Sequence, residues 1–152
     1  MRVESFRDLL DWTSGYHLHL SQCFRQCAHL QKNERSGMLL DYLADKELRL
    51  AACVLGFKHQ GEDKALNTWC TEHLDRHPLM VDAACDEDFA LMSTTEIITE
   101  VEKQHQLIIL LYQNLYDRSH PPKMQELLAE VRDLEVNESQ QMMHGANRLE
   151  DI

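Results

Sequence analysis

Apolar residues recur three and four positions apart along four segments of this chain, and this pattern constrains the fold more than any other feature. Such spacing puts apolar side chains on one face of an α-helix, where other helices can bury them. The segments cover about residues 3–31, 34–59, 93–119 and 121–150. Only 5 Gly and 3 Pro interrupt 152 residues, so a turn-rich sheet fold is disfavoured. The sequence predicts an all-α protein.

The ends of these segments carry residues that begin or end helices. Asn33 is expected to cap the second helix and Gly61 to end it. Ser93, Thr94 or Thr95 can cap the third helix. Two prolines at positions 121 and 122 suit the first turn of the fourth helix, where a missing N–H costs nothing. Short loops therefore join the four helices into two antiparallel hairpins.

The stretch from Gly61 to Ser93 behaves differently, because turn residues surround only a short helical pattern from Ala65 to Leu74. Roughly thirty residues are enough to travel the length of a bundle, so we expect a long crossover that carries a minor helix. Such a crossover makes the second and third helices parallel. The whole chain, residues 1–152, is expected to form a single helical bundle domain.

Charge and composition narrow the classes of partner. A formal charge of -11, from 26 acids against 15 bases, disfavours nucleic acid and anionic membranes, which select clustered Lys and Arg. No stretch approaches the roughly 18 apolar residues of a membrane span. Five cysteines without a CxxC pair, and an N-terminus unlike a secretory signal, predict reduced thiols and a cytoplasmic location. A homodimer is expected because apolar residues exceed what one seam needs; they include Leu110, Leu111, Leu127 and Leu134.

Polar residues interrupt each apolar seam near its middle. They are His17, Glu47, His105, Glu135 and Glu138. At 1.5 Å per residue, His17 and Glu47 lie about 24 Å and 21 Å from the first hairpin loop. His105 and Glu135 both lie about 22 Å from the second loop. If the two loops are at opposite ends of the bundle, all five side chains meet near its middle.

A carboxylate buried without a partner costs several kcal/mol, so converging glutamates must be protonated, paired with imidazolium, hydrated or bound to a cation. Glu and His together form an ordinary ligand set for iron, manganese or zinc. Glu135 and Glu138, three residues apart, project from one helix face, where they could clasp one ion or bridge two. A metal-free Glu–His network, or a helix turned so that one of these side chains meets solvent, would also satisfy the pattern.

Two segments carrying these glutamates, LADKELRLAA and LLAEVRDLEVNESQQMM, resemble the ferritin-like superfamily. In that family a lone Glu and a Glu-x-x-His motif from each hairpin hold two irons or manganese ions. Glu47 and Glu135 match the Glu of those motifs, whereas Leu50 and Glu138 stand where the His would be. His17 and His105 replace the lone glutamates, and Glu102 forms Glu-x-x-His with His105 as a second-rank ligand candidate.

Together these features predict a small ferritin-like protein that binds one or two transition-metal ions at the bundle centre, with no catalysis implied. The cofactor would be iron, manganese or zinc, or none if the network is metal-free. One alternative is a metal-free degenerate bundle that serves as an interaction or oligomerisation module. Another is a metal-dependent oxidase or redox sensor. No local motif of a common enzyme class is present, so the sequence identifies no substrate.

Overall fold

The computed structural model describes residues 3, 5–60, 66, 87–118 and 121–151. These residues form α1 (Phe6–Leu30), α2 (Glu34–Gln60), the 3-10 helix η1 (Glu87–Ala90), α5 (Thr94–Tyr116) and α6 (Pro122–Glu150). The four α-helices are 25, 27, 23 and 29 residues long. The predicted all-α fold of four long helices is confirmed.

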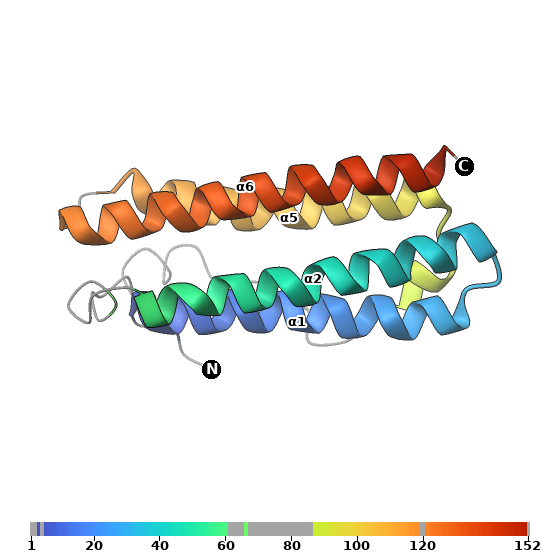
Figure 1. The fold of residues 1–152 in the computed structure, drawn as a ribbon, viewed down its shortest axis with the longest axis horizontal. Coiled ribbons are helices and arrows are strands. Elements are labelled where there is room, and N and C mark those ends of the chain that lie inside the picture. Colours follow the sequence, from blue (N-terminus) through green and yellow to red (C-terminus); the bar gives the residue numbers. More distant parts are fainter. Residues whose placement is uncertain (1–2, 4, 61–65, 67–86, 119–120, 152) are drawn as a thin grey trace.

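The helices lie side by side as two antiparallel hairpins, α1 with α2 and α5 with α6 (Figure 1). Helix α2 ends at one end of the bundle, and α5 begins at the other, so these two helices run in the same direction. This confirms the predicted parallel arrangement, which is compatible with a ferritin-like fold. The minor helix predicted from Ala65 to Leu74 lies outside the described residues, apart from the buried Leu66.

Side chains at the helix starts account for the boundaries. Ser93 caps α5 in a capping box, in which its Oγ accepts from Glu96 N at 3.2 Å and the Glu96 carboxylate accepts from Ser93 N at 3.2 Å. Asn33 Oδ1 accepts from Ser36 N at 3.0 Å ahead of α2, as predicted. Helix α6 begins at Pro122, also as predicted. The expected stop at Gly61 lies outside the described residues.

Two serines of α1 fix how this helix lies along α2. Ser14 Oγ donates to the carbonyl oxygen of Ala51 at 2.9 Å, and Ser21 Oγ donates to that of Ala44 at 2.7 Å. Small residues at these positions let the helix backbones approach closely. His17 lies midway between the two serines on α1, and Glu47 lies midway between the two alanines on α2. The hairpin register therefore puts these two side chains opposite each other.

Three of the four leucines on which the dimer prediction rests pack against the core of this chain. Leu111, Leu127 and Leu134 are partly buried and pack against the core, whereas Leu110 is 55% exposed. The homodimer stays a prediction, and Leu110 alone among these four leucines is largely exposed. None of the helices in the described ranges has an apolar stretch long enough to cross a membrane.

The expectation of reduced thiols is wrong for one cysteine. Cys23 of α1 is disulfide-bonded. Its Sγ also lies 3.5 Å from Nε2 of His19, one turn earlier on the helix. Cys53 of α2 is a free thiol. An odd cysteine count without a CxxC pair therefore did not decide the redox state.

Helices α2 and α6 pack closely because Tyr42 lies directly over a glycine. A Cβ added at Gly145 would lie 1.9 Å from the hydroxyl oxygen of Tyr42 and 2.7 Å from its ring carbon Cζ. That hydroxyl also donates to the carbonyl oxygen of Met142 at 3.5 Å. The absent side chain at Gly145 is thus what admits the Tyr42 ring.

Gly145→Ala should therefore destabilise the protein, although alanine is the better helix former. Displacing the Tyr42 ring should lower the free energy of unfolding by about 1–3 kcal/mol, as overpacking does. Gly56→Ala is the matched control, because a Cβ there meets nothing within 4 Å. It should stabilise by about 0.5–1 kcal/mol through helix propensity. Urea denaturation measures both, and equal effects of the two substitutions would contradict this packing.

Candidate metal centre

Five buried polar side chains meet at the middle of the bundle. His17 comes from α1, Glu47 from α2, His105 from α5, and Glu135 and Ser139 from α6. The two histidines and Glu47 are 0% exposed, Glu135 is 1% exposed and Ser139 is 4% exposed. The structure thus brings together four of the five residues that the seams predicted, and adds a serine. We call these five residues the central cluster.

Hydrogen bonds join the central cluster in a row. His17 Nδ1 lies 2.7 Å from Glu47 Oε2, and His17 Nε2 lies 2.8 Å and 3.1 Å from the two carboxylate oxygens of Glu135. On the other side of Glu47, its Oε1 lies 2.5 Å from His105 Nε2. His105 Nδ1 lies 2.9 Å from Ser139 Oγ. The order is therefore Glu135, His17, Glu47, His105 and Ser139, with one carboxylate between two imidazoles.

Both ring nitrogens of His17 face carboxylates, which only accept, so both must carry protons when the carboxylates are ionised. Burial alone would lower the pKa of His17, but attraction and hydrogen bonds from Glu135 and Glu47 outweigh it and raise the pKa to about 10. Burial would raise the pKa of Glu47, but His105 and His17 outweigh that effect and lower it to about 2. A buried ion pair between His17 and Glu47 follows at neutral pH.

His105 meets a different neighbour at each ring nitrogen. Its Nε2 donates to the ionised Glu47. The hydroxyl of Ser139 at its Nδ1 is both a donor and an acceptor, so it suits a neutral ring as well as a protonated one. The serine therefore orients the ring without fixing its charge.

The sequence pattern missed Ser139, and the fifth predicted residue lies elsewhere. Ser139 follows Glu135 by four residues on the buried face of α6, in the same row as Val131. Glu138, three residues after Glu135, is partly buried and takes no part in the hydrogen bonds of the central cluster. Glu102, the second-rank candidate, is exposed. A strict four-residue step from Val131 would have indicated the serine.

The donor atoms of His17, Glu47 and His105 all lie within 4.8 Å of one another, close enough to hold a metal ion. Two imidazoles and a carboxylate are a common donor set for iron(II) and zinc. The same side chains also satisfy one another without an ion. Among the described residues, Ser36 Oγ alone is a buried side-chain oxygen or nitrogen that lacks a hydrogen-bond partner. The residues present therefore fit a metal ion and also form a complete hydrogen-bonded network.

Two tyrosines, Tyr16 of α1 and Tyr112 of α5, lie on one side of the central cluster. The Tyr16 ring meets the His17 ring edge-on, with 6.0 Å between centroids. Burial, followed by the negative charges of Glu47 and Glu100, raises the pKa of Tyr16, so its phenol stays protonated. One turn from His17 along α1 and two turns from His105 along α5, Thr13 Oγ1 and the Tyr112 hydroxyl lie 2.6 Å apart, and both residues are 0% exposed. This pair closes the core beside the cluster.

No family model, curated protein or solved structure matches this chain. What the central cluster can bind therefore follows from its own geometry.

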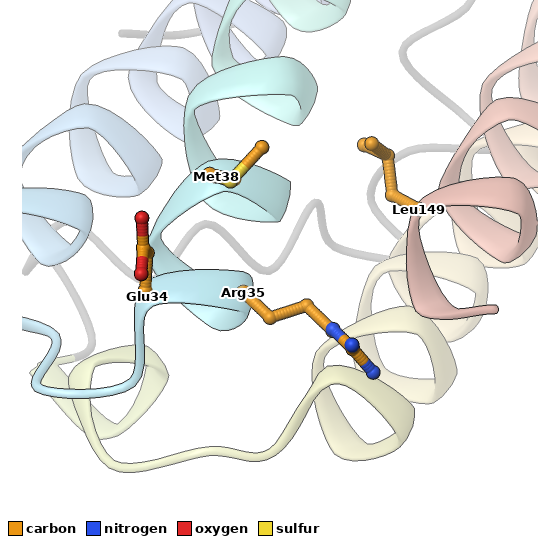
Figure 2. A pocket seen from close by; sticks show the side chains of 4 residues that line it. All are labelled: Glu34, Arg35, Met38 and Leu149. Carbon is orange, nitrogen blue, oxygen red and sulfur yellow. The ribbon is translucent and has the colours of Figure 1, made fainter. Parts of the chain in front are cut away.

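A pocket of about 190 Å³ lies near one end of the bundle, where α2 begins and α6 ends (Figure 2). It is lined by Glu34, Arg35, Met38 and Leu149. At 1.5 Å per residue along α2, Glu34 is roughly 20 Å from Glu47, so this pocket is not an entrance to the central cluster.

The ion pair at the centre gives the metal-free protein a defined pH dependence. The raised pKa of His17 stabilises the fold fully below its ordinary value of 6.5, and that contribution is lost as pH rises through about 10. The lowered pKa of Glu47 stabilises above its ordinary value of 4.5, and that contribution is lost as pH falls through about 2. These two groups together predict greatest stability between pH 4.5 and 6.5.

Urea denaturation with a chelator present, at pH 6 and at pH 9.5, tests the alkaline side. The wild type should lose stability between the two values. His17→Gln should be less stable than the wild type at pH 6 but should lose much less on going to pH 9.5, because it has no imidazolium to discharge. An equal alkaline loss in both proteins would contradict a protonated His17.

Proposed function

We propose that this chain is a ferritin-like protein that binds one divalent transition-metal ion, iron, manganese or zinc, at the centre of its bundle. The observation that carries this proposal is the meeting of His17, Glu47 and His105, fully buried and from three helices, with donor atoms within 4.8 Å of one another. Apolar side chains would fill the same space with no desolvation penalty. The presence of ionisable groups at this position therefore favours a binding role.

The atoms that face each other indicate which side chains are ligands. Glu47 directs one oxygen toward Nδ1 of His17 and the other toward Nε2 of His105. We assign these two nitrogens and the Glu47 carboxylate as the ligands. The outer nitrogens of both rings remain bonded to Glu135 and Ser139. Ligating histidines almost always donate their second N–H to such a partner, which orients the ring.

The number of donors favours a single ion over two. A ferritin-like dinuclear centre uses six side chains. Here three residues supply ligands and two more orient them. Three protein ligands leave a position open on a metal ion, where a water or a substrate can bind. The ion would act there as a Lewis acid.

Metal analysis of protein purified without chelator tests the assignment. The wild type should contain one ion per chain, and Glu47→Gln should contain almost none, because the amide keeps the shape but removes the central negative charge. Glu138→Gln is the control, since this partly buried residue of α6 lies outside the hydrogen bonds of the cluster. It should keep its metal. Loss of metal from the control and not from Glu47→Gln would refute this ligand set.

The outer partners should have smaller effects than the ligands. Glu135→Gln and Ser139→Ala should each weaken metal binding about 10–100-fold, the usual cost of removing a group that orients a ligating histidine. Titration with Co²⁺ measures the affinity. An effect of either substitution as large as that of Glu47→Gln would make its residue a ligand.

The completeness of the hydrogen-bonded network favours one alternative, a metal-free bundle that acts as an interaction or oligomerisation module. In that case Glu135→Ala would leave a buried imidazolium without its partner and open a cavity, costing about 2–5 kcal/mol. Thermal melts with and without chelator separate the two functions. A melting temperature of the wild type that does not change with chelator, together with a strongly destabilised Glu135→Ala, would establish the metal-free network.

A further inference from the structure

The central cluster is closed to solvent, so an ion can reach it only if a covering side chain moves. Its three proposed ligands are 0% exposed. The backbones of α2 and α6 pack closely, and Tyr42 fills the space over Gly145 between them. The backbones of α1 and α5 approach each other less closely. Side chains bridge that wider separation.

The bridge at the level of the cluster consists of the sequence neighbours of the two histidines. Tyr16, next to His17, donates its hydroxyl proton to Oε1 of Gln104, the residue before His105. The Tyr16 ring stacks on Trp12 with 5.5 Å between centroids and 21° between planes. Tyr16 is 8% exposed, whereas Thr13 and Tyr112, which form the next bridge along the helices, are 0% exposed. The bridge of Tyr16 and Gln104 is thus closer to solvent than the bridge of Thr13 and Tyr112.

Polar atoms continue from this bridge toward the surface. Gln104 Nε2 donates to Oε1 of Glu100 at 3.0 Å, and Glu100 is only partly buried. A cation arriving from solvent would first meet the Glu100 carboxylate, then the amide oxygen of Gln104 and the phenol of Tyr16. Oxygen atoms of this kind can replace the hydration water of a divalent ion step by step.

We propose that Tyr16 is the gate through which a metal ion enters and leaves the centre, along a route marked by Glu100 and Gln104. This inference rests on the proposed metal-binding function. Swinging the ring outward breaks one hydrogen bond and one ring stack, and it uncovers the edge of His17. Tyr16 contacts no proposed metal position itself, so it controls rates and not affinity.

The experiment follows Co²⁺ uptake by the metal-free full chain through its visible absorbance, and Co²⁺ release into an excess of chelator. Tyr16→Phe removes the hydrogen bond and should speed uptake and release equally, by about fivefold. Tyr16→Ala also removes the stacked ring and should speed both by about tenfold or more. The ratio of the two rates, and therefore Kd, should not change. Tyr42→Phe is the matched control on the α2–α6 side and should leave both rates as they are.

The possible outcomes test the gate and the metal centre separately. A wild type that binds Co²⁺, with rates unaltered in both Tyr16 variants, overturns the gate and leaves the metal centre standing. A Kd that weakens in Tyr16→Phe with no change in uptake rate makes the tyrosine part of the site and also overturns the gate. Rates that rise equally in Tyr42→Phe place the entrance elsewhere. A wild type that takes up no Co²⁺ overturns the proposed function, and the gate with it.

Discussion

The contact on which the rest of this structure depends is the carboxylate of Glu47 between the rings of His17 and His105. Its oxygens lie 2.7 Å and 2.5 Å from one nitrogen of each ring. Removing a negative charge from water to the middle of a bundle is costly, and only partners that are already held in place offset the cost. Everything around Glu47 serves to hold those partners.

The helices achieve this through ordinary packing. Ser14 and Ser21 tie α1 to α2 on either side of the cluster, which fixes His17 against Glu47. The second hairpin then closes over the first, with Tyr42 packed over Gly145. That closure brings His105 and Glu135 to the same level. The polar centre is therefore positioned by packing contacts at other levels of the helices.

Much of this arrangement could be predicted from the sequence, because apolar seams and capping residues are local signals. The four helices, their direction and the positions of His17, Glu47, His105 and Glu135 follow from counting residues along seams. The role of Ser139 does not follow from this count. The residues three and four positions after Glu135 differ by about 100° around the helix axis, and both lie near the face of Glu135. The seam indicated Glu138, and the buried face contains the serine. The Tyr42–Gly145 contact depends on two helices at once, so no single segment could reveal it.

The charges at the centre explain why the same five side chains suit both a metal ion and a metal-free network. With both carboxylates ionised, Glu47 and Glu135 contribute two negative charges to a region with almost no solvent. A protonated His17 balances one of them. A divalent ion with both imidazoles neutral balances the two together. Metal binding and protonation of His17 therefore compete at the same pair of buried carboxylates. The ferritin-like pattern, with four carboxylates and two imidazoles, needs two divalent ions for the same balance. The central cluster has two carboxylates and not four, so its charge matches one divalent ion.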